Sequence, residues 1–160
     1  MKRIITVVAL AFVFVSCNNT NNNTANGTAA STDPVKEVAK PEHLDEPSFS
    51  KKVCDFNSAG AFKYLGDKPC VVDFYADWCK PCKRLGPTME ELAAEYQGKI
   101  YIYKVNVDEN PNVSRYFAVD GIPAVFFIPM SGNPQTLVGL YPKEDYVKQI
   151  NEFLLKGATK

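Results

Sequence analysis

Histidine, tryptophan and long apolar runs are scarce in this chain of 160 residues, which has one histidine and one tryptophan. Basic and acidic residues both number 18, so the formal net charge is zero. No basic patch is visible, and nucleic-acid-binding domains need one, so we expect no nucleic-acid partner. A second long apolar segment and internal repeats are also missing, which leaves one ordinary domain plus a tail.

The only long apolar run follows the basic start M-K-R and extends from Ile4 to Val15. It is shorter than the roughly 20 apolar residues that cross a bilayer, and this combination is typical of a secretory signal peptide. The segment F-V-S-C that ends at Cys17 resembles the lipobox of bacterial lipoproteins, although Phe14 stands where such boxes usually carry leucine. We therefore expect residues 1–16 to be a lipoprotein-type signal peptide and Cys17 to be lipidated. Ordinary cleavage and a retained anchor are the alternatives.

Residues 17–39 are polar and small, and they contain no aromatic residue. Such a segment cannot bury enough apolar surface to offset its ordering entropy, so we expect a flexible tether from lipidated Cys17. The lipid would hold the protein on a membrane of the bacterial cell envelope, facing the periplasm.

The remaining residues, 40–160, alternate predicted strands and helices. Apolar runs predict buried strands over 70–76, 100–107 and 122–129, with shorter strands over 41–45 and 135–139. Helical periodicity predicts helices over 48–56, with Ser48 as the N-cap, and over 82–98, 112–117 and 143–155. This order predicts an α/β fold with a mixed central sheet and helices on both faces.

Residues 77–82 read D-W-C-K-P-C, and the two cysteines lie between a predicted buried strand and the longest predicted helix. A C-x-x-C pair in this position is typical of a redox motif. At a helix N-terminus, unpaired backbone N–H groups and the positive end of the helix dipole stabilise a thiolate at Cys79, and the thiolate is the nucleophile. Cys82 lies one turn further on, within reach of a mixed disulfide formed at Cys79.

A metal site and a static structural disulfide are the alternatives for this pair. Zinc needs more soft ligands, and with His43 as the single histidine and no second C-x-x-C motif, Cys54 and Cys70 would have to converge on the site. So short a link stores little loop entropy, which argues against a purely structural disulfide. We expect no metal and no cofactor.

The segment V-D-F-Y-A-D-W-C-K-P-C-K, residues 72–83, resembles the active-site segment of thioredoxins. The resemblance covers about residues 40–160 and continues in order with Pro87, K-V-N-V-D at 104–108, Asn110-Pro111, G-I-P at 121–123 and Val138-Gly139. It implies the thioredoxin fold and a thiol–disulfide oxidoreductase that works through a redox-active Cys79–Cys82 disulfide.

The resemblance also implies individual roles. Cys79 corresponds to the attacking nucleophile and Cys82 to the resolving cysteine. Asp73 corresponds to a buried acid that accepts the Cys82 proton, and burial raises the pKa of such a carboxyl toward neutrality. Lys104 corresponds to a lysine that faces this acid and tunes it, whereas the alternative is an exposed lysine without a role.

A substrate-binding surface around the dithiol is implied as well. Pro123 corresponds to a cis-proline that turns the Ile122 backbone toward an extended substrate segment. A core tryptophan is the alternative for Trp78. The implied surface consists of Trp78, Lys80, Pro81, Gly121, Ile122, Pro123 and Gly139.

Two features depart from the usual thioredoxin pattern. Lys80 stands where glycine is common, and a cation beside the Cys79 thiolate favours the reduced protein, which makes it more oxidising by about 15 mV. That shift is small against the gap of about 150 mV that separates thioredoxin from a strong periplasmic oxidant. Cys54 and Cys70 are extra, and we expect two free thiols, with a disulfide between them or a regulatory disulfide as alternatives.

We therefore expect a lipid-anchored monomer that reduces disulfides of exported proteins and draws electrons from a membrane donor. Within the enzyme class, the alternatives are a disulfide oxidase or isomerase and a dedicated reductant of apocytochrome thiols. A non-enzymatic adaptor with this fold would usually lack one of the two cysteines, and both are present.

Overall fold

The computed structural model describes residues 38–58 and 60–156. The expected signal peptide, Cys17 and nearly all of the tether lie outside the described residues. The elements are β1 (Glu42–His43), α1 (Glu46–Lys52), β2 (Cys70–Tyr75), α2 (Lys80–Glu95), β3 (Tyr101–Asn106), α3 (Pro111–Tyr116), β4 (Ala124–Ile128), β5 (Gln135–Val138) and α4 (Lys143–Gln149), which continues as a π-helical segment, η1 (Ile150–Leu155). This is the predicted order of strands and helices.

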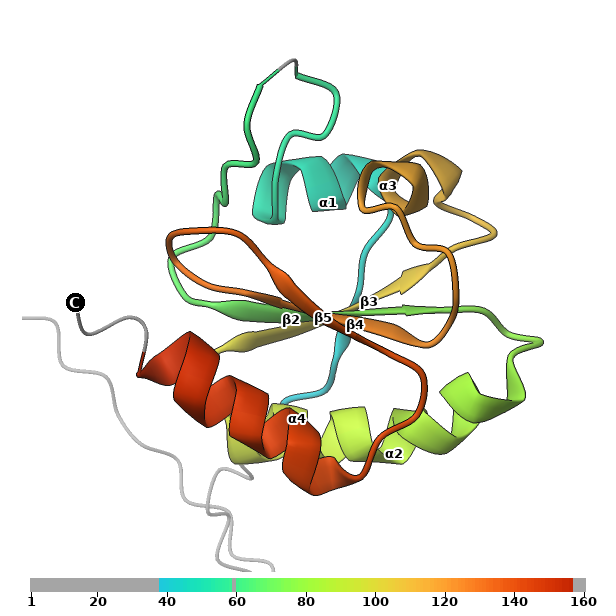
Figure 1. Cartoon of the computed structure of the whole chain (residues 1–160), viewed down its shortest axis with the longest axis vertical. Coiled ribbons are helices and arrows are strands. Elements are labelled where there is room, and N and C mark those ends of the chain that lie inside the picture. Colours follow the sequence, from blue (N-terminus) through green and yellow to red (C-terminus); the bar gives the residue numbers. More distant parts are fainter. Residues whose placement is uncertain (1–37, 59, 157–160) are drawn as a thin grey trace, which may run out of the picture. The chain divides into compact units, whose positions relative to one another are not determined.

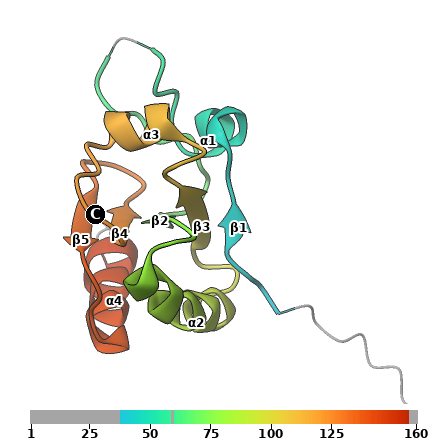
Figure 2. The ribbon, with the colours of Figure 1, turned by 90° about the vertical axis from the view of Figure 1, so that its right-hand side faces the viewer.

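The five strands form one mixed sheet in the order β1-β3-β2-β4-β5. Strands β1 and β2 run parallel to β3, whereas β4 is antiparallel to β2 and β5 is antiparallel to β4. Helices α1 and α3 cover one face of the sheet, and α2 and α4 cover the other (Figures 1 and 2). The predicted mixed sheet with helices on both faces is confirmed.

Strand β2 is central because both of its faces are apolar, and its side chains divide the core into two layers. Val72 and Phe74 pack with Phe49 of α1 and Val113 of α3. On the opposite face, residues of α2, α4 and η1 pack against Val71 of β2; they are Leu85, Met89, Leu92, Tyr146, Ile150 and Leu154. Asp73 follows Val71 by two residues and therefore points toward the same side, that of α2, where it is the exception in an otherwise apolar strand.

The N-cap predicted for the first helix is wrong. Asp45 caps α1, and its carboxylate accepts the Ser48 backbone N–H at 2.9 Å, while the Ser48 hydroxyl accepts the Asp45 backbone N–H at 3.0 Å. This reciprocal capping box satisfies two backbone donors at once, which a cap at Ser48 alone could not do. The helix consequently begins at Glu46, and its N-cap lies three residues earlier than predicted.

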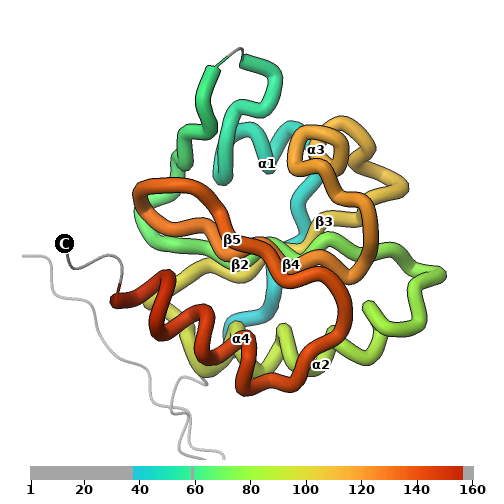
Figure 3. The backbone as a smooth tube through the Cα atoms, viewed as in Figure 1, coloured from blue at the N-terminus to red at the C-terminus, as the bar shows by residue number. Residues whose placement is uncertain are grey.

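After β5 the chain turns directly into α4, which runs beside α2 under the same face of the sheet (Figure 3). Tyr146, Ile150 and Leu154 of α4 and η1 are fully buried, whereas Val147 and Phe153 pack at the margin of the core. Within residues 38–58 and 60–156, no helix is both long and apolar enough to cross a membrane.

Candidate active site

The dithiol lies at the junction between β2 and α2. Cys79 is the N-cap residue of α2, and the Cys82 backbone N–H donates to Cys79 Sγ at 3.2 Å. The two residues form a disulfide, with Cα atoms 5.3 Å apart. Both cysteine side chains are buried, with 3 % of each residue exposed.

The surroundings of Cys79 favour negative charge on its sulfur. Helix α2 is 16 residues long, and its first turn contains no acidic residue. Lys80 and Lys83 are exposed beside the motif. Because the helix N-terminus offers a backbone donor and a positive dipole end, a thiolate at Cys79 would be stabilised there.

Asp73 lies on β2, the strand that leads to the dithiol, and is completely buried. Neither of its carboxyl oxygens has a hydrogen-bond partner within residues 38–58 and 60–156. Burial raises the pKa of Asp73 to about 6, and the nearby positive charge of Lys104 opposes this rise. A carboxyl with that pKa is ionised at neutral pH, yet it is a stronger base than an ordinary aspartate.

Lys104 is the register partner of Asp73 in the parallel β2–β3 pairing. Its ammonium lies 4.4 Å from the centroid of the Tyr75 ring, over the ring face. In the described ranges it forms no salt bridge with Asp73, so it acts on the carboxyl through space and not through a direct contact. Lys104 is half-buried at this position.

Trp78 lies on the surface, with 67 % of its side chain exposed, so the alternative of a core tryptophan is wrong. Its indole Nε1–H donates to Asp108 Oδ2 at 2.8 Å, which fixes the ring next to the dithiol. Lys80 and Pro81, between the cysteines, are exposed as well.

The other residues of the implied substrate surface gather on the far side of the dithiol. The Ile122–Pro123 peptide bond is cis, and Ile122 packs against Cys79 and Cys82. The Gly139 backbone N–H donates to the Pro123 carbonyl at 2.8 Å, which ties the end of β5 to this turn. Gly139 has a φ of +104°, a conformation that suits glycine. Gly121 lies in the same turn and would meet Val138 if it carried a Cβ.

Cys54 and Cys70 are free, buried thiols in the core between the sheet and α1. Burial raises the pKa of each to about 12, so neither is a nucleophile at neutral pH. The expected free thiols are confirmed. Within the described ranges, no three histidine, cysteine, aspartate or glutamate side chains are arranged to hold a metal ion.

No role is predicted from the sequence for three polar residues near the site: His43, Tyr75 and Asp108. Tyr75 follows Asp73 by two residues and therefore shares its face of β2, and its hydroxyl lies 3.1 Å from His43 Nδ1. Asp108 anchors Trp78. The period of two along the strand could have identified Tyr75, whereas the contacts of His43 and Asp108 depend on distant segments.

A redox disulfide at the N-terminus of a helix, with a buried carboxyl on the preceding strand and a cis-proline turn packed nearby, defines a thiol–disulfide oxidoreductase. The thioredoxin family model matches residues 47–152. A thioredoxin of Borreliella burgdorferi is 36 % identical over 110 residues, which are 69 % of this chain and 94 % of that protein. A thioredoxin of Chlorobaculum thiosulfatiphilum is 43 % identical over 88 residues, which are 55 % of this chain and 82 % of that protein.

Among solved structures, that of chloroplastic thioredoxin z has a TM-score of 0.59 at 26 % sequence identity, over 72 % of this chain and 95 % of that one. The chain belongs to the thioredoxin family, and the predicted thioredoxin fold is confirmed.

Proposed function

We propose that this protein is a lipid-anchored thioredoxin of the bacterial cell envelope that reduces disulfides of exported proteins. The sequence before the folded domain supports the location, because a short apolar run ends at Cys17 and a polar segment follows. The observation that carries the chemistry is the buried carboxyl of Asp73, which has no hydrogen-bond partner among the described residues and lies on the strand that leads to the dithiol.

The first step is attack by the Cys79 thiolate on one sulfur of the substrate disulfide. The substrate S–S bond breaks, a mixed disulfide forms at Cys79, and the other substrate sulfur leaves as a thiolate. The helix N-terminus stabilises the attacking thiolate. Trp78 and the turn at Ile122 and Pro123 offer the partly exposed apolar surface against which an extended substrate segment can lie.

The second step releases the substrate. Cys82 transfers its proton to the Asp73 carboxylate and attacks Cys79 Sγ, so that the Cys79–Cys82 disulfide forms and the second substrate sulfur leaves as a thiolate. Two electrons have then passed from the protein dithiol to the substrate. A dithiol donor in the membrane restores the reduced protein, and Asp73 returns its proton to solvent.

Asp73 assists the resolving step, because that step requires deprotonation of a buried thiol. Its pKa of about 6 leaves it ionised, and ready to accept that proton, at neutral pH. In the reverse reaction the same carboxyl returns the proton, so the direction of net electron flow follows from the reduction potential of the Cys79–Cys82 pair. Lys80 makes the protein more oxidising by about 15 mV. This shift is a small part of the range of reduction potentials between reductants and oxidants of this fold.

The test combines the anchor with the chemistry in bacterial cells that express the chain. Cys82→Ser should accumulate mixed disulfides with exported proteins, because the resolving thiol is missing. A fatty-acid label should appear on the chain and disappear in Cys17→Ser, the matched control. Mixed disulfides confined to cytoplasmic proteins, or a label that survives in Cys17→Ser, would contradict the envelope assignment without affecting the redox chemistry.

A further inference from the structure

A row of three titratable side chains crosses the sheet beneath α2. His43 on β1 pairs in register with Lys104 on β3, and Lys104 pairs in register with Asp73 on β2. Residues in register on neighbouring strands project from the same face of a sheet, so the three side chains lie on one face. This row connects the exposed edge strand β1 with the buried carboxyl at the centre.

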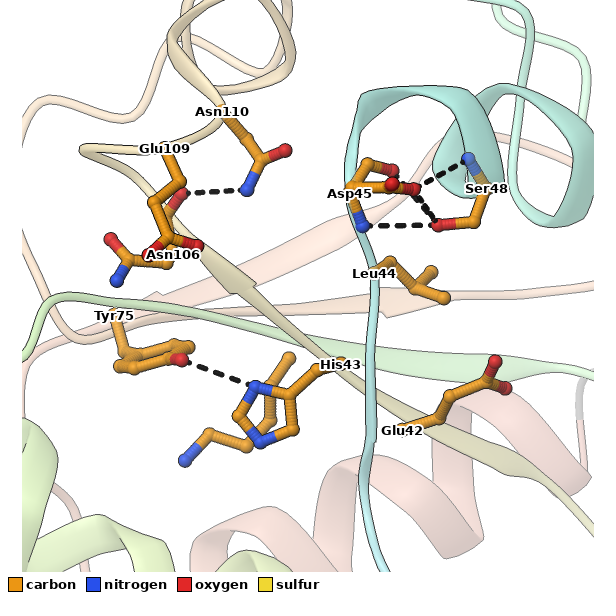
Figure 4. A pocket seen from close by; sticks show the side chains of 10 residues that line it. Glu42, His43, Leu44, Asp45, Ser48, Tyr75, Asn106, Glu109 and Asn110 are labelled. Carbon is orange, nitrogen blue, oxygen red and sulfur yellow. Dashed lines mark hydrogen bonds between the residues drawn. The ribbon is translucent and has the colours of Figure 1, made fainter.

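Tyr75 bridges the first two members of the row. The ammonium of Lys104 lies over its ring, 4.4 Å from the centroid. Its hydroxyl reaches His43 Nδ1 at 3.1 Å, and the two rings meet edge to face with centroids 5.8 Å apart. Figure 4 shows this hydrogen bond, with the side chains of His43 and Tyr75 pointing toward one another.

Two clefts meet at these side chains. One, of about 360 Å³, is lined by Cys82, Pro87 and Gly86 of α2 as well as by His43, Tyr75 and Lys104. The other, of about 490 Å³, is lined by the same three residues together with others that include Asn106 and Asn110. Lys104 therefore borders both clefts, and its ammonium lies over the ring of Tyr75.

We infer that Tyr75 and His43 are positioning residues that hold Lys104 at a set place beside Asp73, and that they thereby control proton transfer from Cys82. This inference rests on the role of Asp73 in the proposed function. Lysine has a long, flexible side chain that turns readily toward water, and a cation over an aromatic face is held by an attraction of about 0.5–2 kcal/mol. Without the ring, the ammonium moves toward solvent, and the Asp73 carboxylate loses part of its stabilising charge.

Other charged and titratable groups near the row contribute to the electrostatic field at Asp73 independently of Tyr75 and His43. They are Glu42 on β1, Asp77 in the turn after β2, Lys83 and Glu90 on α2, Glu109 after β3 and Tyr146 on α4. The comparison of variants must therefore separate the loss of Lys104 placement from general changes in this field.

The experiment measures the resolving step directly. Reduced protein is mixed with a synthetic aromatic disulfide, and the release of the second aromatic thiolate is followed against pH. In the native protein the rate rises as Asp73 ionises. Lys104→Met should move this rise to higher pH, and Tyr75→Leu should move it in the same direction by about half a pH unit, a part of the ~1–3 units that a close opposite charge is worth.

The decisive measurement is the double variant. If Tyr75 acts through Lys104, Tyr75→Leu adds no further shift in the Lys104→Met background. An equal shift in both backgrounds would overturn the inference, because the ring would then act independently of the lysine. Absence of any shift in Lys104→Met would overturn the inference alone, because Asp73 could still accept the proton without the lysine. The role of Asp73 in the proposed function is tested separately by Asp73→Asn, which should abolish the rise of the rate with pH.

Two further variants guard against loss of fold. His43→Ala lies on the exposed edge strand and should give a smaller shift in the same direction, again absent without Lys104. Tyr101→Leu is the matched control, because it removes a ring that lies under another lysine, Lys68 Nζ at 5.3 Å, away from Asp73. It should leave the pH dependence unchanged, and a shift as large as that of Tyr75→Leu would contradict the inference.

Discussion

Asp73→Asn removes an ionisable group from a site that opposes ionisation. The carboxyl is fully buried without a hydrogen-bond partner in the described ranges, and its pKa is raised from an ordinary 3.8 to about 6. A rise of about 2 units means that keeping this carboxyl ionised costs the folded protein about 3 kcal/mol at pH 7. We therefore expect the oxidised Asp73→Asn protein to be more stable than the native protein at neutral pH.

The pH dependence follows from the protons bound by each state. Between pH 3.8 and about 6, the folded protein keeps the Asp73 proton while the unfolded chain loses it. The contribution of Asp73 to stability therefore falls as pH rises through this window and is constant above it. Asparagine does not titrate, so the stability gain should be smallest below pH 4 and reach about 3 kcal/mol near pH 7.5.

Urea unfolding of the oxidised proteins, followed by circular dichroism from pH 4 to pH 8, measures this difference. For a domain of this size the gain corresponds to roughly 10–15 °C in the melting temperature. Asp77→Asn is the control, because Asp77 is an exposed acid in the turn after β2 and should give no comparable gain. Equal stability of the native protein and Asp73→Asn at pH 7.5, or a gain that does not grow with pH, would refute the assignment of the raised pKa.

Three further substitutions probe the site. Cys82→Ser should still attack a substrate disulfide but stop at the mixed disulfide, which non-reducing gels detect; full turnover in this variant would contradict the resolving role. Tyr146→Phe removes the hydroxyl that accepts the Tyr141 backbone N–H at 3.2 Å, a hydrogen bond worth about 1 kcal/mol. Because the loop after β5 is then held less firmly, KM for protein disulfides should rise while kcat is unchanged. Steady-state kinetics separates the two constants, and a fall in kcat alone would contradict this role. Lys80→Gly should make the protein more reducing by about 15 mV in a glutathione titration, whereas a change of ten times that size would show that Lys80 dominates the potential.

The architecture could be predicted because its signals are local. The apolar runs that become β2, β3 and β4 are buried on both faces, and such runs are legible without knowledge of their partners. The C-x-x-C pair likewise lies at a strand-to-helix junction that the sequence displays directly. The wrong N-cap of α1 shows where local signals compete, since Asp45 and Ser48 are both good caps and only their reciprocal bonding decides.

The remainder of the site depends on register, which single-sequence patterns do not contain. His43 reaches the vicinity of Asp73 because a strand of two residues pairs with β3 at one position and not at a neighbouring one. A slip by one residue would turn His43 to the other face. The π-helical end of α4 was also beyond prediction, because an ordinary helical period described those residues equally well.

The reduction potential of the Cys79–Cys82 pair tests the central claim most directly. The purified protein is equilibrated in glutathione or dithiothreitol buffers, and the free thiols are trapped by alkylation. A reductant should have a potential near −250 mV or lower, close to the value of about −270 mV for thioredoxin. A potential above about −180 mV, in the range of oxidases and isomerases, would contradict the account and make this a disulfide-forming protein.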